Sequence, residues 1–462
     1  MQAVVCVKPV RGELSPFDAA AVESALRLRE KQPDTAVTVV SMGRPDTAEP
    51  LRRLARLGIS RAILLSDSAF AGADTLATAY TLSLAMKKLQ PDLILCGRQS
   101  IDGDTAQTGP ALAALLGWPV LTHVLAWRLE GKRALCTTRF GEEAATLPAL
   151  LTVERLYPLR FPRLGSKAGA VETWTAEALG ADPVRCGLRG SPTRVLRSYE
   201  AKLDRRQCRF AAPKDLDTII REALEKPRME WTAYPCPHPL PAVWYVGETP
   251  PALVRRCADR VITVPRSAPE QLAERFRREN PPVVLWPADL WGRRTAPQVA
   301  AMLRTGLCAD CTGLETDGQH VTMIRPAMGG GVLAAIACRT RPTMATVREE
   351  GQRDGVTVAV GAGAAASLPA IRAWALNRGY ALAASRALVD RGMAPYTSQV
   401  GLTGKTVRSQ VYVAIGISGA VQHTCAIEGA GTVIAINPDR NARIFDCADV
   451  GICADAEDLT LE

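Results

Sequence analysis

A lysine and a threonine close the stretch QVGLTGKT, residues 399–406, in the order that ends a phosphate-binding P-loop. In a P-loop, backbone N–H groups cradle nucleotide phosphates, and the first glycine stands five positions before the glycine of the Gly-Lys pair. That position is occupied by Gln399, so the pattern fails. Only a common tripeptide matches, and it does not by itself predict a triphosphate site.

A second glycine-containing turn follows the apolar run VTVAV, residues 356–360. The turn GAGAAA, residues 361–366, has the G-x-G-x-x-A spacing that lets a backbone approach a pyrophosphate. An acidic residue for the ribose is expected about 20 positions further on, but the nearest one is Asp390. The spacing alone therefore leaves dinucleotide binding at this turn open.

A third candidate is the polar loop RQSIDGDTAQTGP, residues 98–110, which leads into the helical pattern ALAALLG, residues 111–117. The free N–H groups at the start of a helix suit an anion or a nucleotide. The alternative is an ordinary connection between a strand and a helix, with no ligand. Both interpretations stay open on the pattern alone.

A metal site is not expected. The chain has one CxxC pair, Cys308 and Cys311 in CADC, and only four histidines. A structural zinc site takes four Cys or His ligands, usually as two spaced pairs. The thirteen cysteines are scattered and lie mostly in apolar runs. This usage is typical of reduced, buried thiols in a cytosolic protein.

Composition argues against a nucleic-acid partner and against membrane insertion. The net charge is +9, but Lys and Arg are spread along the chain, and aromatic residues make up only 5%, too few for a base-stacking surface. The start, MQAVVCVKPV, reads as a strand and not as a signal peptide. The most apolar stretch, residues 411–421, is far shorter than the roughly 20 residues of a membrane helix. We therefore expect a cytoplasmic protein.

These candidate sites must be positioned by alternating strands and helices. Apolar runs at 3–8, 36–42, 61–66 and 92–97 predict strands, and helical patterns such as 16–31 and 73–89 lie between them. Fully apolar strands separated by helices predict an α/β fold with a parallel sheet covered on both faces. In such a sheet, ligands bind outside the carboxyl ends of the strands.

The rest of the chain repeats this alternation of strands and helices after a segment of different composition. Residues 183–241 are rich in Pro, Arg and other charged residues, which predicts an extended arm and linker with one helix near 216–226. New apolar runs begin at 242, and a last α/β pattern begins at 356. We predict that the chain divides into four parts, which are residues 1–200, 201–240, 241–345 and 346–462.

Five segments in fixed order carry a resemblance to a known family. They are SR (385–386), VGLTGKT (400–406), VYVAIGISGAVQH (411–423), TVIAIN (432–437) and IFDCADVGICAD (444–455). Together they resemble the FAD domain of the electron-transfer flavoprotein alpha subunit, and CADCTGL and TRPTMATVR upstream are also similar to that subunit. The first half resembles the beta subunit, through VVCVKPV, SPFDAAAVE, VSMG, AFAGADTLATAY, DLILCGRQSIDGDTAQTGP and LPALLTV.

The resemblance implies a fused, single-chain electron-transfer flavoprotein. It implies a beta-like nucleotide-binding domain at 1–200, an arm at 201–240, an abbreviated alpha-like domain at 241–345 and a Rossmann-like FAD domain at 346–462. Such a protein takes electrons from a flavoprotein dehydrogenase and passes them to a quinone oxidoreductase or a ferredoxin-type acceptor. One alternative is an electron bifurcator, an enzyme that oxidises NADH with two FADs. Another is an adenine-nucleotide-binding interaction module without redox use.

The resemblance also implies which residues bind FAD. Arg386 is expected near the isoalloxazine, Thr403 near flavin N5 and His423 near the C2 carbonyl. The pyrophosphate would lie among residues 418–422, and the adenosine end near residues 437 and 455. Where the family has Gln within VGQTGK, this chain has Leu402. The full expected set is Ser385, Arg386, Val400, Gly401, Leu402, Thr403, Ser418, Gly419, Ala420, Val421, Gln422, His423, Asn437 and Asp455.

In the beta-like half the family holds a second adenine nucleotide, either AMP or a second FAD. The small residues of DGDTAQTG would leave room for a diphosphate close to the backbone. Leu164 matches the residue that enters a partner dehydrogenase. The expected set for the second nucleotide is Cys6, Ser15, Phe17, Asp18, Met42, Ile101, Asp102, Gly103, Asp104, Thr105, Ala106, Gln107, Thr108 and Gly109.

Overall fold

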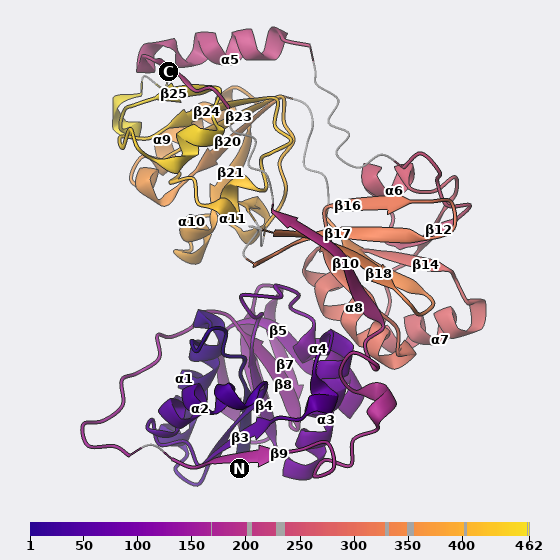
Figure 1. Ribbon diagram of the computed structural model, residues 1–462. Coiled ribbons are helices and arrows are strands. Elements are labelled where there is room, and N and C mark those ends of the chain that lie inside the picture. Colours follow the sequence, from indigo (N-terminus) through magenta and orange to yellow (C-terminus); the bar gives the residue numbers. More distant parts are fainter. Residues whose placement is uncertain are drawn as a thin grey trace.

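The computed structural model describes residues 1–167, 169–200, 206–227, 236–328, 332–348, 355–401, 404–459 and 461. Within those ranges the strands form sheets of nine, four, seven and five strands. Figure 1 shows an N-terminal group of elements in indigo to magenta, a middle group mainly in pink and orange, and a C-terminal group mainly in light orange to yellow. The predicted α/β fold class is confirmed.

The nine-stranded sheet belongs to the N-terminal group and has the order β7-β6-β5-β8-β4-β1-β2-β3-β9. At its centre β1 (Gln2–Cys6) lies parallel between β2 (Ala36–Met42) and β4 (Leu93–Gly97). These strands are almost fully apolar because helices cover both faces. The predicted strands of this half are confirmed. The other members are β3 (Arg61–Leu65), β5 (Val120–Glu130), β6 (Arg133–Thr138), β7 (Gly141–Thr146), β8 (Ala149–Val153) and β9 (Val171–Trp174).

Capping side chains determine where the helices of this group begin. The hydroxyl of Ser15 accepts a backbone N–H at the start of α1 (Pro16–Lys31). The carboxylate of Asp74 accepts two N–H groups at the start of α3 (Thr75–Leu89). Both residues are of the types that prefer the N-cap position. The group also contains α2 (Ala48–Ala55) and α4 (Thr108–Leu116).

The middle group contains two sheets. The parallel five-stranded sheet has the order β13-β12-β14-β19-β15, and the antiparallel four-stranded sheet has the order β10-β18-β17-β16. β10 (Thr193–Glu200) comes from the segment expected to be an arm, and it pairs with β18 (Val332–Cys338). The other elements are β12 (Val243–Val246), α6 (Ala252–Arg256), β13 (Val261–Val264), α7 (Pro269–Glu279), β14 (Val283–Pro287), α8 (Leu290–Leu303), β15 (Leu307–Cys311), β16 (Gly313–Thr316), β17 (Val321–Ala327) and β19 (Thr343–Val347).

The C-terminal sheet is parallel, with seven strands in the order β11-β25-β24-β23-β20-β21-β22. Its edge strand β11 (Arg209–Ala211) comes from the expected arm. The predicted helix of that arm is confirmed as α5 (Leu216–Glu225), whose apolar side packs into the core of this sheet. The other elements are β20 (Val356–Val360), α9 (Leu368–Asn377), β21 (Ala381–Ser385), α10 (Arg386–Asp390), β22 (Gln399–Val400), β23 (Val411–Ile415), α11 (Val421–Thr424), β24 (Thr432–Ile436) and β25 (Val450–Ile452).

Polar contacts join the three groups. Arg294 of α8 pairs with Glu143 of β7 at 2.7 Å, which ties the middle group to the N-terminal sheet. Arg139, between β6 and β7, lies 3.6 Å from Asp390 of α10 in the C-terminal group. Among the helices that the structure describes, none combines the length and the apolar character needed to cross a membrane.

Candidate functional site

The C-terminal sheet has a crevice at the carboxyl ends of its strands. β20 is followed in sequence by β21 on one side, whereas β23 lies on its other side, so the strand order reverses there. At the end of these strands the N–H of Gly363 donates to the carbonyl of Gly416 at 3.2 Å. A Cβ on Gly361 would come within 2.1 Å of that carbonyl oxygen. Only glycine permits this close approach, and such a crevice is where ligands bind in open α/β sheets.

The loop after β23 offers free donors at this crevice. Among the described residues, the N–H groups of Ser418, Gly419 and Ala420 have no acceptor. Ser418 and Ala420 are exposed, as is Gln422 in the following helix α11. Gly419 has a φ of 83°, and a Cβ there would lie 2.0 Å from the nitrogen of Ile444. The loop can therefore present backbone N–H groups to a phosphate anion.

His423 lies in α11 and is buried. Its Nε2 is 2.8 Å from the hydroxyl of Tyr412 on β23. Burial lowers the pKa of His423 to about 4, and a hydrogen bond with the Val400 backbone opposes part of that shift. The imidazole is therefore neutral near pH 7. Tyr412 was not among the expected site residues, because the sequence of an apolar strand does not show which residue its one hydroxyl contacts.

Ser385 and Arg386 stand at the carboxyl end of β21. The hydroxyl Oγ of Ser385 is buried and has no partner among the described residues, which marks a position where a polar ligand can bind. The Nε of Arg386 donates to Asp390 at 3.2 Å, and its guanidinium lies 5.2 Å from the Phe17 ring centroid in the N-terminal group. Burial, and then the charges of Arg98 and Arg155, lower the pKa of Arg386.

The turn after β22 is held by backbone contacts. The N–H of Lys405 donates to the carbonyl of Gln399 at 2.8 Å, and a Cβ on Gly404 would lie 2.1 Å from the same oxygen. Val400 and Gly401 are buried beside α11. Burial also lowers the pKa of Lys405, a residue that the expected set omitted. Leu402 and Thr403 lie outside the described residues, so their expected roles stay predictions.

The two residues expected at the adenosine end differ in exposure. Asn437 follows β24, is buried, and donates through Nδ2 to the carbonyl of Ile417 at 3.0 Å. It thereby connects the end of β24 to the glycine loop. Asp455 is exposed and takes part in a capping box with Asp458, in which each side chain accepts the other's backbone N–H. Asp455 lies beyond β25, two strands away from β23.

The N-terminal sheet has a corresponding crevice between β1 and β4, where its strand order also reverses. Cys6 of β1 and Cys96 of β4 are neighbours in the register of these two strands, and both thiols are free. Asp18 of α1 lies above them and accepts the N–H of Lys8 at 3.0 Å. Burial raises the pKa of Asp18 to about 7. A Cβ on Gly97 would lie 2.4 Å from the Asp18 carboxylate, so this glycine is needed for the close packing of α1 against the crevice.

The loop 101–109 borders this crevice. Asp102 pairs with Lys8 at 2.6 Å, and its carbonyl accepts the N–H of Met328 from the middle group at 3.1 Å. Asp104 and Ala106 have positive φ values of 51° and 54°. Gly103 and Thr105 are half-buried, whereas Ile101 is exposed.

The end of the same loop is anchored by Gln107. This side chain accepts a hydrogen bond from Thr75 and donates to the carbonyl of Leu307 at 3.3 Å. Thr108 begins α4. A Cβ on Gly109 would lie 2.5 Å from Thr152, so glycine lets α4 pack closely on β8.

The remaining expected residues surround Cys6. Ser15 and Phe17 are buried at the start of α1, and Met42 ends β2. Three guanidinium groups surround the Phe17 ring, from Arg98 at 4.6 Å, Arg155 at 5.1 Å and Arg386 at 5.2 Å. The structure therefore brings the two crevices together across a basic cluster, and Figure 1 shows α10 on the side that faces the N-terminal group.

Sequence reasoning missed the acidic group that balances this cluster. Glu154, which follows β8, is buried and lies 3.1 Å from both Arg98 and Arg139. Burial opposes its ionisation, but the charges of Arg98, His123 and Arg139 lower the pKa of Glu154 to about 2. Two nitrogens of Arg98, Nε and Nη2, remain without a partner among the described residues. No spacing in the sequence signals these contacts, because the residues belong to separate elements.

Two other expectations concern single features. Leu164 is fully exposed in the loop between β8 and β9. The thiols of Cys308 and Cys311 are buried, with their sulfur atoms 3.4 Å apart. In the part of the chain that the structure describes, no three His, Cys, Asp or Glu side chains gather as metal ligands would.

Comparison with known families gives two matches. Residues 3–179 and 251–373 match the electron transfer flavoprotein domain. Residues 352–428 match the electron transfer flavoprotein FAD-binding domain. The second match contains the crevice of the C-terminal sheet from β20 to α11.

Similar curated proteins include both kinds of subunit. The caffeyl-CoA reductase-Etf complex subunit CarD of Acetobacterium woodii is 43% identical over 196 residues, which are 40% of this chain and 75% of CarD. The electron transfer flavoprotein subunit beta of Clostridium acetobutylicum is 37% identical, over 43% of this chain and 87% of that subunit. The subunit alpha of Thermoanaerobacterium thermosaccharolyticum is 35% identical, over 40% of this chain and 70% of that subunit. The predicted resemblance to both subunits is confirmed.

Proposed function

Because this chain belongs to the electron transfer flavoprotein family, we propose that it accepts electrons from a flavoprotein dehydrogenase and passes them to a membrane or soluble acceptor. Electron transfer is the role of the family, and the C-terminal part of the chain is its FAD-binding domain. The observation that carries the finer proposal is the crevice at the carboxyl ends of β20 and β23. There Ser385, the loop 416–420 and Asn437 meet at one edge of one sheet.

The residues of this crevice fit FAD. The buried Ser385 hydroxyl and the N–H groups of Ser418, Gly419 and Ala420 have no partners among the described residues, and these are the donors that a pyrophosphate requires. When bound, FAD supplies the redox chemistry, and the protein supplies binding and electrostatics. Arg386 would hold positive charge beside the ring system. We propose that the other members of the expected FAD set, Thr403 included, line the same site.

We further propose that the crevice between β1 and β4 binds a second adenine nucleotide, either AMP or a second FAD. The close contacts of Gly97 and Gly109 support this proposal. These glycines let α1 and α4 pack closely against the strand ends, and the loop 101–109 borders the crevice. Lys8 provides an ammonium group there, which pairs with the carboxylate of Asp102.

We propose that Leu164 docks into the partner dehydrogenase. Its full exposure, together with that of the nearby Phe161, supports this role, since two large apolar side chains on one loop are suited to burial in a partner. The name of CarD describes a complex of caffeyl-CoA reductase and Etf. We also propose that the chain divides at residues 1–200, 201–240, 241–345 and 346–462. We propose that its FAD domain rotates and so sets the distance between the flavin and its partners.

The cofactor content of the purified chain tests the proposal. We expect bound FAD together with either AMP or a second FAD, measured by absorbance and chromatography after denaturation. Anaerobic titration with NADH then separates two functions, because a carrier without bifurcation is not reduced by NADH. Reduction by NADH with two FADs present would favour the bifurcating enzyme. A chain that stays free of flavin after incubation with FAD would contradict the redox function altogether.

A further inference from the structure

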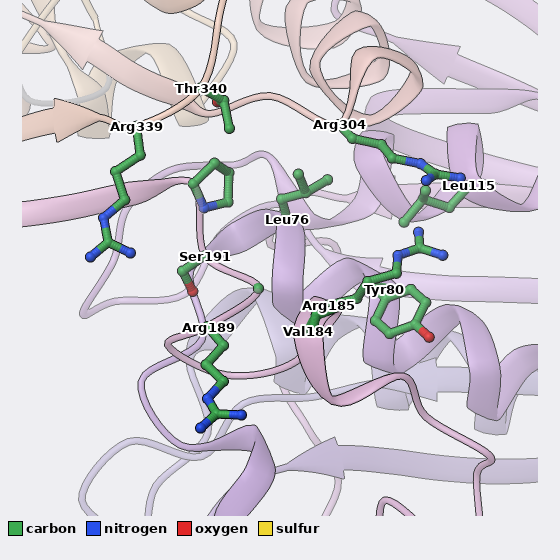
Figure 2. Close-up of a pocket in the computed structure, with 12 residues that line it drawn as sticks. Leu76, Tyr80, Leu115, Val184, Arg185, Arg189, Ser191, Arg304, Arg339 and Thr340 are labelled. Atoms are coloured by element: carbon green, nitrogen blue, oxygen red, sulfur yellow. The ribbon is translucent and has the colours of Figure 1, made fainter.

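A pocket lies between the helices of the N-terminal sheet and the middle group, and none of its lining residues belongs to the two nucleotide crevices. Its volume is about 270 Å³. Leu76 and Tyr80 of α3 and Leu115 of α4 form one side, as Figure 2 shows. The loop 184–192 and Thr340 of the middle group complete the lining.

Arginine dominates the polar lining of this pocket. The four arginines are Arg185, Arg189, Arg304 and Arg339, and no lining residue is acidic. Among the described residues, none of these four guanidinium groups has a carboxylate within 4.0 Å. The pocket therefore carries uncompensated positive charge, which concentrates anions.

Two acidic residues, Asp74 and Asp182, lie two positions before lining residues in the sequence and make hydrogen bonds to the backbone. The carboxylate of Asp74 accepts hydrogen bonds from the N–H groups of Leu76 and Ala77, and also from Thr193. The carboxylate of Asp182 accepts the N–H of Val184 at 3.0 Å. Because both carboxylates cap backbone N–H groups, they do not neutralise the arginines by direct pairing.

The loop that carries two of the arginines is held in place before any ligand binds. The guanidinium of Arg185 stacks 3.9 Å from the Tyr80 ring centroid. The Tyr80 hydroxyl accepts the N–H of Asp182 at 3.1 Å. The buried Ser191 hydroxyl donates to the carbonyl of Gly187 at 2.6 Å and accepts the N–H of Asp74 at 2.8 Å. Such preorganisation reduces the entropy lost when a ligand binds.

We propose that this pocket binds a small soluble anion that carries two phosphate groups. Figure 2 shows Arg185 and Arg304 pointing toward one side of the pocket, with Arg189 and Arg339 on the other side. The fork of a guanidinium group matches the geometry of phosphate oxygens, so the arginines on each side can bind one phosphate group. The volume suits a diphosphate and is small for a whole dinucleotide. A bound anion contacts both α3 and the middle group, so it also stabilises the contact between the N-terminal group and the middle group.

Calorimetric titration with inorganic pyrophosphate tests this inference. The FAD-containing protein is used at constant ionic strength, with saturating AMP so that the crevice between β1 and β4 is occupied. We expect saturable binding that weakens roughly tenfold or more in Arg185→Ala and in Arg304→Ala, because each removes charge-assisted hydrogen bonds. The matched control is Arg133→Ala, an exposed arginine on β6, which should bind like the unaltered chain.

Three outcomes would overturn the proposal. The first is equal affinity in Arg185→Ala, Arg304→Ala and Arg133→Ala. The second is the absence of saturable binding under AMP saturation, which would assign any pyrophosphate binding to the nucleotide crevice. The third is arginine-dependent flotation with phosphatidic acid vesicles and no binding of free pyrophosphate, which would assign the pocket to a lipid surface. Unchanged circular dichroism and FAD content show that a variant is folded.

Discussion

At the scale of single residues, His423 shows how burial determines chemistry. A neutral imidazole has one N–H to donate and one nitrogen that accepts. His423 is within hydrogen-bond distance of the Tyr412 hydroxyl and also interacts with the Val400 backbone. Any donation from this ring to a flavin carbonyl therefore competes with a contact inside the protein. The expected role of His423 depends on how that competition is resolved when FAD binds.

The same burial predicts a pH dependence of stability. The pKa of His423 falls from 6.5 to about 4 on folding. Between these values the unfolded chain binds more protons, so the folded state loses stability as the pH falls from about 6.5 to 4. The loss is of order 1–3 kcal/mol for this one group. Urea unfolding at several pH values, in the unaltered chain and in His423→Gln, should give a shallower slope for the variant.

His320 provides the control for this measurement. Its side chain is 74% exposed and pairs with the local Asp317. The variant His320→Gln should therefore keep the full slope between pH 4 and 6.5. An identical slope in His423→Gln and the unaltered chain would contradict the assignment of a buried, neutral His423.

At the scale of elements, the glycine loops determine whether the strand ends can approach a ligand. Gly416 and Gly419 both have positive φ, at 64° and 83°. A Cβ on Gly416 would lie 2.4 Å from the nitrogen of Ala364 in the turn after β20. The two loops at the crevice of the C-terminal sheet are therefore in backbone contact, and a side chain in either one would separate them.

We expect Gly419→Ala to lower both stability and FAD content. The new Cβ would lie 2.0 Å from the Ile444 backbone nitrogen, and backbone cannot move aside as a side-chain end can. Together with the left-handed φ, this contact should cost more than about 2 kcal/mol in the free energy of unfolding. FAD per chain after purification and denaturant unfolding would measure the two effects.

The matched control is Gly379→Ala. Gly379 also has a positive φ of 69°, but a Cβ there meets no atom within 4 Å. The substitution should lower the free energy of unfolding only by the backbone strain of about 1–2 kcal/mol. It should leave the FAD content unchanged. Equal FAD loss in both variants would show that the close approach of residue 419 is unimportant.

At the scale of the whole molecule, a basic cluster around the buried Glu154 joins the N-terminal group to the C-terminal group. Arg139 is central, since it contacts Glu154 at 3.1 Å, Asp390 at 3.6 Å and the Tyr396 ring at 4.4 Å. Glu154 belongs to the N-terminal group, whereas Asp390 and Tyr396 belong to the C-terminal group. One side chain therefore holds contacts on both sides of the boundary.

We expect Arg139→Ala to loosen the C-terminal group from the N-terminal group without unfolding either. Amide hydrogen exchange should become about tenfold faster or more at residues 386–396, because local opening there costs less free energy. The strands β23 and β24 should keep their protection. Arg128→Ala, which removes an exposed pair with Glu130, should change nothing at 386–396. Faster exchange throughout β23 and β24 would mean global destabilisation and would refute a role confined to the boundary.

Much of the fold was predictable from the sequence because local signals agreed with it. The apolar runs that became β1 to β4 are bounded by turn residues, and Ser15 and Asp74 stand where helices begin. The membership of β10 and β11 in two sheets was not predictable. Their exposed, charged residues resemble a linker, and only pairing with β18 and β25 makes them strands.

By itself, the sequence determined the family, the α/β class and the residues at the strand ends, because these depend on local spacing and on ordered motifs. The tertiary structure decided which side chains meet across distant segments. It placed Arg386 beside Phe17, Glu154 between two arginines, and four arginines around one pocket. Such contacts depend on how separate sheets pack together. Charge and burial at those positions are therefore properties of the folded chain.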